Sequence, residues 1–352
     1  MSRNTNIEIL RIISMVMIVL SHFTVHNGVA NSSLPFGLNR FLLEWSTLGN
    51  IGVILFILIT GYYSFNKSNP FKLKRLLSMV FQVFFYAVSI YLIFVLCGWE
   101  KFAPLGFISN LFPIIFKKYW FMTAFVVLYI FMPYINRLIE ALDRREHLRF
   151  IIVSLLLFSI IPMLTTKNMF GNEIVQFLMF YMIGAYLGKY KDNYFNNKKH
   201  CYSVLIVSAL VLFGSVVVAD LLGSRFGVLA EHSTYLFARN SIVSIAFATS
   251  LFSAFALRKP FTNNIVNSVA ACTLGVYLIS DNSLIRHVLW SDWLNVPGVV
   301  DKPILILHMF ACVFLVFIGC AVIEFVRQNT IERLFSISYD AVEKKIIAKK
   351  NG

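Results

Sequence analysis

Long apolar runs recur along this sequence, and each approaches the length that crosses a lipid bilayer. A hydrocarbon core about 30 Å thick is spanned by roughly 20 helical residues. The chain is 58% hydrophobic and only 14% charged, whereas a soluble domain carries about 25% charged residues. The candidate spans are residues 8–27, 47–65, 76–97, 119–136, 150–166, 174–190, 202–219, 240–257, 266–290 and 304–326.

These ten runs predict an all-α fold, a polytopic transmembrane helical bundle. Unpaired backbone groups are too costly in lipid for an irregular chain, and the runs lack strand-like alternation. We assign residues 1–330 to one transmembrane domain and 331–352 to a cytoplasmic amphipathic, basic tail along the membrane surface. The stretch 102–118 contains two prolines and is shorter than a span, so it is expected to be re-entrant or interfacial.

The distribution of basic residues predicts that both chain ends are cytoplasmic. The formal net charge is +14, but the basic residues form short clusters between apolar runs, which does not favour nucleic-acid binding. Cytoplasmic connections of membrane proteins are enriched in Lys and Arg. With the N-terminus inside, the outer connections hold only nine of the 31 Lys and Arg residues: Arg40, Lys101, Lys117, Lys118, Lys167, Arg225, Arg239, Arg286 and Lys302.

Two ionisable residues, Arg11 and His22, bracket the apolar part of the first run. Eleven residues at about 100° each make three turns plus about 20°, so both side chains lie on one helix face, separated by a rise of about 16 Å. A charged group at membrane depth costs at least ~2.5–3.5 kcal/mol and usually faces a cavity or a partner. The shared face favours a common cavity. The alternatives are that Arg11 anchors the helix at the inner leaflet and that His22 is a hydrogen-bonded bundle residue.

His26 follows His22 by one turn and forms an H-x-x-x-H pair. This spacing can hold zinc, but neither a third ligand nor a glutamate base accompanies it in the sequence. We therefore predict no metal site and place His26 at the outer mouth. Histidine itself suits proton transfer, because its ordinary pKa is about 6.5.

A basic stretch, "NPFKLKRLL", precedes the third span and contains Lys72, Lys74 and Arg75. One interpretation is that it sets topology and attracts anionic lipids. The other is that it binds a phosphorylated cytoplasmic donor, because ammonium and guanidinium groups suit phosphates.

Polar and aromatic residues within other spans are weaker candidates. Asp281 could orient His22 or the acceptor, or it could be a structural group facing Arg286. Trp120 and Tyr129 could stack on an acceptor or simply pack in the bundle. Glu324 and Arg327 are three residues apart near the inner end of the last span, which is typical of an interfacial pair.

Four segments resemble the acyltransferase 3 family of integral-membrane sugar O-acyltransferases, over roughly residues 1–330. They are "NIEILRIISMVMIVLSHF", the basic stretch before the third span, "YWFMTAFVVLYIFMPYINRL" and "TLGVYLISDNSLIR". The R-x10-H element of the family matches Arg11 and His22. Its R-x-x-R pair corresponds to Lys72 and Arg75, with lysine at the first position. Trp120 matches the tryptophan of the fourth-helix motif, whose acidic pair in some relatives is absent here.

The resemblance implies a ten-helix core and an acyl-CoA donor, usually acetyl-CoA, used from the cytoplasmic side. We therefore expect a multi-pass enzyme of a bacterial-type inner membrane that moves an acyl group to a hydroxyl of a cell-surface or exopolysaccharide sugar. Lys72, Lys74 and Arg75 would hold the CoA phosphates, with Arg11 as a further candidate. His22 would deprotonate the sugar hydroxyl or accept the acyl group itself.

Acyl-CoA, a cell-surface or lipid-linked glycan and membrane lipids are the expected partners, and no permanently bound cofactor is expected. A polysaccharide polymerase or a lipid-linked sugar transporter is the main alternative, because it would also have many spans and basic edges. Either would need a large outer loop or a continuous polar path across the bundle. The outer connections of this sequence are short and its spans contain few polar residues, which disfavours this alternative.

Overall fold

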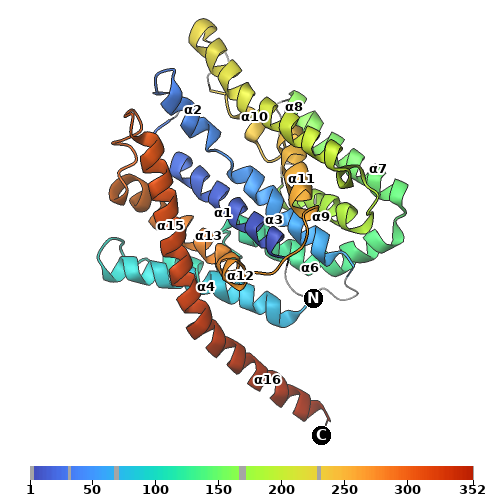
Figure 1. Cartoon of the computed structure of the whole chain (residues 1–352). Helices are drawn as coiled ribbons and strands as arrows, with labels where there is room; N and C mark the ends of the chain where they lie inside the picture. The colour runs from blue at the N-terminus through green and yellow to red at the C-terminus, as the bar shows by residue number, and fades with distance from the viewer. Residues whose placement is uncertain (1–3, 31–32, 67–70, 166–171, 228–230, 352) are drawn as a thin grey trace.

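A computed structural model describes residues 4–30, 33–66, 71–165, 172–227 and 231–351, and every regular element in these ranges is a helix (Figure 1). Within these ranges, seven helices are long and apolar enough to cross a membrane, and a bent helix pair would be an eighth. The prediction of an all-helical, multi-pass membrane protein is confirmed. The number of crossings and the placement of the chain ends in the cytoplasm stay predictions.

All ten predicted spans coincide with helices. The corresponding elements are α1 (Thr5–Val25), α3 (Gly49–Ser64), α4 (Leu73–Leu96), α6 (Trp120–Ala141), α7 (Arg144–Leu155) with the π-helix η2 (Leu156–Ile160) and α8 (Ile161–Thr165), α9 (Glu173–Lys189), α10 (Lys198–Phe226), α11 (Ile242–Ala256), α12 (Asn264–Ala271) with α13 (Thr273–Ser280), and α15 (Leu305–Arg327). The remaining elements are α2 (Leu38–Trp45), α5 (Pro104–Leu111), η3 (Tyr194–Asn196), η4 (Tyr235–Phe237), α14 (Ile285–His287), η5 (Val288–Trp293), η6 (Gln328–Glu332) and α16 (Arg333–Asn351).

Three of the predicted spans differ from a simple crossing. Helix α9 has 17 residues and α11 has 15, which at 1.5 Å per residue is less than a bilayer core of about 30 Å. The predicted span 266–290 is not one straight helix, because Asn264–Ser280 and Ile285–Trp293 are bent by 94° relative to each other. Within the stretch 102–118, α5 has eight residues, which agrees with a segment too short to cross.

The centre of the bundle is formed by α1, α3 and α9, whose backbones approach closely at glycines. A Cβ atom on Gly61 would lie 2.2 Å from the carbonyl oxygen of Tyr181, and one on Gly184 would lie 2.3 Å from that of Leu58. Gly52 similarly faces the backbone of α1. Small residues at such points let transmembrane helices pack backbone against backbone. Helix α1 also contacts α11, α12, α13 and α15, so the first helix is surrounded by later ones.

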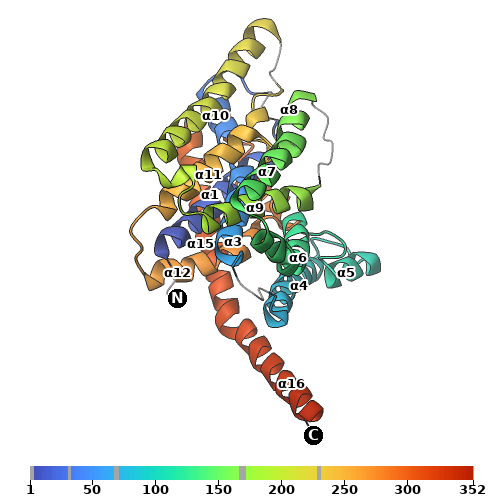
Figure 2. The ribbon, with the colours of Figure 1, turned by 90° about the vertical axis from the view of Figure 1, so that its right-hand side faces the viewer.

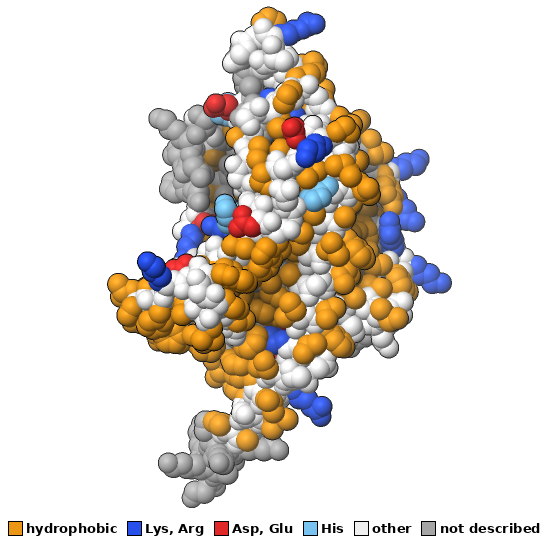
Figure 3. Space-filling view, turned by 90° about the vertical axis from the view of Figure 1, so that its left-hand side faces the viewer, with side chains coloured by type: hydrophobic (Ala, Val, Ile, Leu, Met, Phe, Trp, Pro, Cys, Tyr) orange, Lys and Arg blue, Asp and Glu red, His pale blue; other side chains and the backbone are white. Residues whose placement is uncertain are grey.

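The outer surface of the bundle is apolar. Exposed side chains along α15 include Leu307, Phe310 and Phe314, and hydrophobic side chains cover much of the face shown in Figure 3. Such a surface would be a liability in water but suits contact with lipid.

Contacts between connections agree with an alternating topology. The predicted inner ends meet one another: the backbone N–H of Thr5 donates to Phe261, and Lys74 pairs with Asp340 at 2.7 Å. The predicted outer connections also meet, since the side chain of Asn39 donates to the backbone of Lys302 at 2.9 Å. Three of the 31 residues in the charge count, Arg3, Lys67 and Lys167, lie outside the described residues.

The last helix extends beyond the bundle. Helices α15, η6 and α16 follow one another without a break from Leu305 to Asn351, and α16 leaves the body in both ribbon views (Figures 1 and 2). Phe335 of α16 stacks on Phe81 of α4 with ring centroids 4.4 Å apart. The predicted tail is therefore helical near its start, and its position along the membrane surface stays a prediction.

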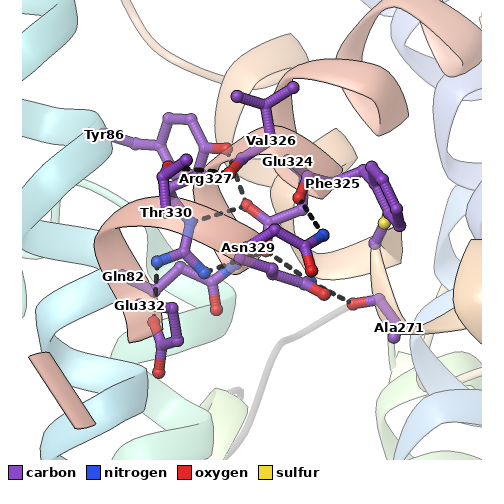
Figure 4. Close-up of polar contacts among 12 residues, drawn as sticks. Gln82, Tyr86, Ala271, Glu324, Phe325, Val326, Arg327, Asn329, Thr330 and Glu332 are labelled. Carbon is purple, nitrogen blue, oxygen red and sulfur yellow. Dashed lines mark hydrogen bonds and ion pairs between the residues drawn. The ribbon is translucent and has the colours of Figure 1, made fainter. Parts of the chain in front are cut away.

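A buried polar network joins α4 to α15 (Figure 4). Glu324 and Arg327 form the expected pair, with Arg327 Nε donating to Glu324 Oε2 at 2.8 Å, and both are buried within the protein, being 0% and 4% exposed. Their position at the membrane interface stays a prediction. Gln82 and Tyr86 also donate to Glu324, at 3.0 and 2.7 Å. A buried charge is tolerated when it is paired and hydrogen-bonded in this way. The network therefore fixes α4, which carries Arg75, against α15.

Candidate active site

One cavity of about 580 Å³ runs alongside α1 and brings the separate candidate residues together. Arg11 and His22 of α1 line it, as do His26 directly after α1, Arg75 of α4 and Asp281 after α13. The predicted shared face of Arg11 and His22 is thus a cavity wall. Because these two residues are separated by a rise of about 16 Å along the helix, the cavity has an arginine end and a histidine end.

The ring of His22 contacts polar groups through both nitrogens. Nδ1 lies 3.3 Å from Ser280 Oγ, and Nε2 lies 3.7 Å from Asp281 Oδ1. Ser280 is fully buried and is not among the described residues that line the cavity, whereas Asp281 does line it. The Nε2 edge of the ring is therefore the one beside the cavity. The longer separation exceeds a hydrogen bond, but catalytic contacts are often long before substrate binds.

Asp281 reaches this position because α13 ends at Ser280 and the chain then bends by 94° into the next helical segment. Irregular backbone at membrane depth is tolerated where it is covered by protein or lines a cavity. The break is also held from outside the cavity, since the side chain of Asn282 donates to Tyr119 Oη at 2.6 Å. The local fold thus turns the buried carboxylate of Asp281 towards α1.

His26 has a carboxylate partner that the neighbouring sequence does not contain. His26 Nε2 lies 3.2 Å from Asp281 Oδ1, so Asp281 supplies the third ligand type that the neighbouring sequence lacks. Candidate ligand atoms of His22, His26 and Asp281 all lie within 4.8 Å of one another, and two imidazoles and a carboxylate are suitable zinc ligands. Hydrogen bonding between His26 and Asp281 accounts for the same arrangement. The predicted absence of a metal stays a prediction.

The predicted donor-binding cluster is only partly at the cavity. The guanidinium of Arg75 lies 5.8 Å from the ring centre of Tyr129, and Arg75 lines the cavity. Lys74 instead forms its ion pair with Asp340 of α16. Lys72 contacts Tyr129 through its backbone, whose N–H donates to Tyr129 Oη at 3.0 Å. Among the described residues that line the cavity, neither lysine appears.

Arg11 is held by its own helix at the arginine end of the cavity. Its Nη1 atom lies 3.2 Å from Glu8 Oε2, one turn earlier. The side chain of Arg11 is 33% exposed, so this partner leaves it accessible from the cavity. Arg11 and Arg75 therefore place two guanidinium groups, from different helices, around one end of the cavity.

The two aromatic candidates have different positions. Trp120 lines the cavity and is covered on one side by Arg239, whose guanidinium carbon lies 4.4 Å from its ring centre. Arg239 is itself held by a 2.6 Å hydrogen bond to Gln176. Tyr129 is buried and supports the start of α4 through Lys72. Trp120 can thus meet a ligand, whereas Tyr129 acts through the residues that it positions.

Sequence reasoning missed two residues near the histidine end. Ser280 precedes Asp281 and contacts His22, and its adjacency to an intramembrane carboxylate is the signal that could have found it. Arg286 lines the cavity, although it was considered above only as a structural partner of Asp281. An arginine five residues after that carboxylate, just past a helix break, was the corresponding signal.

A bundle of apolar helices with a histidine and a carboxylate facing one cavity, and two arginines at the other end, has the form of a membrane-embedded group-transfer enzyme. A family model described as an acyltransferase domain matches residues 4–325, nearly the whole chain. The protein therefore belongs to the acyltransferase 3 family and is a membrane acyltransferase. No curated protein and no solved structure matches it.

Proposed function

We propose that the protein transfers an acyl group, with acetyl as the expected one, from cytoplasmic acyl-CoA to a hydroxyl of a cell-surface or exopolysaccharide sugar. The observation that carries the proposal is the single cavity shared by His22 at one end and by Arg11 and Arg75 at the other. The expected location is a bacterial-type inner membrane. The predicted orientation puts the arginine end on the cytoplasmic side, where acyl-CoA is available.

The donor would bind with its phosphates at Arg11 and Arg75, because guanidinium groups form strong, charge-assisted contacts with phosphate oxygens. Its pantetheine arm would then extend along α1 towards His22. Lys72 and Lys74 would add positive potential at the entrance rather than direct contacts inside the cavity. We assign Lys74 this indirect role because it already forms a 2.7 Å ion pair with Asp340.

For the chemistry, the Ser280 hydroxyl would accept a hydrogen bond from Nδ1–H of His22, which leaves Nε2 with its lone pair at the cavity. Nε2 takes the proton of the sugar hydroxyl as its oxygen attacks the thioester carbonyl. Collapse of the tetrahedral intermediate breaks the carbon–sulfur bond, and the imidazolium returns the proton to the leaving thiolate. Asp281 stabilises the imidazolium. In the alternative order, Nε2 first accepts the acyl group and then passes it to the hydroxyl.

Two measurements test this function. Purified protein in detergent should transfer labelled acetyl from acetyl-CoA to glycans extracted from the producing cells, with release of one CoA thiol per ester formed. NMR of surface glycans from cells with and without the gene should show O-acetyl signals that depend on it. If neither the transfer nor the gene-dependent O-acetyl signal is found, the proposed donor and acceptor are wrong.

A further inference from the structure

The histidine end of the cavity carries a positive group that the mechanism does not use. Arg286 lines the cavity and is exposed. Among the described residues, no carboxylate lies within ion-pair distance of its side chain. The nearby carboxylate of Asp281 is already shared between His26 at 3.2 Å and His22 at 3.7 Å. Arg286 is therefore available to a ligand.

Trp120 provides an apolar surface at the same end. Tyr119, its neighbour in sequence, accepts the hydrogen bond from Asn282, which follows Asp281, so the start of α6 and the break after α13 are joined. One side of the indole is covered by Arg239 at 4.4 Å. This contact fixes the ring and adds a second positive charge behind it. The wall thus combines a fixed aromatic ring, which suits the apolar face of a sugar, with the guanidinium group of Arg286, whereas Arg239 lies behind the ring and does not line the cavity.

We infer that the acceptor carries an anionic group, a carboxylate or a phosphate, close to the hydroxyl that is acylated, and that Arg286 binds this group while the sugar ring lies against Trp120. This inference rests on the proposed function and names the chemical class of its acceptor. The fork of the guanidinium matches the paired oxygens of either anion. Binding there would hold the hydroxyl beside His22, which lines the same cavity.

The first experiment asks which acceptors receive the acyl group. Glycans extracted from the producing cells are separated by anion exchange into neutral and acidic pools, and each is incubated with purified protein and labelled acetyl-CoA. Label in the acidic pool alone is expected. Label in the neutral pool at a similar rate would overturn the inference but leave the acyltransferase function intact. Label in neither pool would contradict the proposed function and, with it, this inference.

The second experiment separates binding of the acceptor from a general catalytic role. Arg286→Gln should raise KM for the acidic pool by about tenfold to a hundredfold, the range expected for a charge-assisted contact. The KM for acetyl-CoA should not change, and Arg286→Lys should recover part of the loss. Lys302→Gln is the matched control, because Lys302 is an exposed cation on the same predicted side but outside the cavity lining. A fall in kcat with unchanged acceptor KM would overturn the inference.

Chemical treatment of the acidic pool distinguishes the two sources of negative charge. Carbodiimide activation followed by borohydride converts carboxylates to alcohols and leaves phosphates in place. If labelling is lost after this treatment, the anion is a carboxylate. If labelling persists and still depends on Arg286, the anion is a phosphate, and either result supports an anionic acceptor.

Discussion

His22 lines the cavity, with Ser280 beside its Nδ1 atom and Asp281 beside its Nε2 atom. Its removal should therefore change chemistry more than folding. His22→Ala is expected to abolish acyl transfer while leaving membrane insertion and abundance near those of the unmodified protein. Transfer from labelled acetyl-CoA and immunoblotting of membranes measure the two effects.

The control for this substitution is His232→Ala, which removes an exposed histidine away from the cavity. It should retain transfer. An active His22→Ala protein would remove the central catalytic assignment. If His22→Ala instead disappears from the membrane, the histidine is a structural residue of the bundle.

Arg75 is the predicted donor-binding cation that the structure places at the cavity. Arg75→Ala should weaken binding of acyl-CoA by about tenfold to a hundredfold, because a charge-assisted contact shielded from water contributes roughly 1.5–3 kcal/mol. Arg75→Lys should recover part of this, since it keeps the charge but loses the planar fork. Isothermal titration with a non-hydrolysable acyl-CoA analogue measures the affinity directly.

Lys74→Ala is a control from the same turn of α4. Because Lys74 pairs with Asp340 outside the cavity, this substitution should alter the affinity far less than Arg75→Ala. If both variants bind the analogue normally, the basic stretch sets topology alone and Arg11 is the remaining phosphate-binding candidate.

At the scale of helices, the sequence was informative where a signal is local. The positions of all ten helical segments follow from apolar length, and the common face of Arg11 and His22 follows from the helical period. The contact between His26 and Asp281 joins residues 255 positions apart and depends on how α13 packs beside α1. Likewise, the ion pair between Lys74 and Asp340 depends on the direction in which α16 extends. Neither arrangement has a local signal.

The close approach of α3 and α9 predicts a large difference between two glycines. Gly184→Ala should lower the free energy of unfolding by about 1–3 kcal/mol, because the new Cβ must displace a backbone carbonyl that now lies 2.3 Å away. Gly214→Ala on α10 is the control, since no atom lies within 4 Å of its new Cβ. It should be neutral or slightly stabilising. Thermal unfolding in detergent compares them, and equal stability would contradict the close packing.

At the scale of the whole molecule, orientation decides which substrate reaches which end of the cavity. Reporters fused after residue 145 and at the C-terminus should be cytoplasmic, and one inserted near residue 30 should be external. The reason is that outer connections hold nine of the 31 basic residues. Accessibility of engineered cysteines to a membrane-impermeant reagent checks the result independently. A reversed pattern would move the donor to the histidine end and overturn its placement at Arg11 and Arg75.

The central position of α1 also has a consequence for biosynthesis. The helix that carries His22 is synthesised before α13, because Ser280, which contacts the His22 ring, comes 258 residues later. At roughly 5–20 residues per second, translation of that interval takes about 13 to 50 s. During this time α1 is in the membrane without the residues that orient its histidine. An incomplete chain on the ribosome therefore lacks an assembled site, and under the proposed function it would not consume acyl-CoA before its acceptor pocket exists.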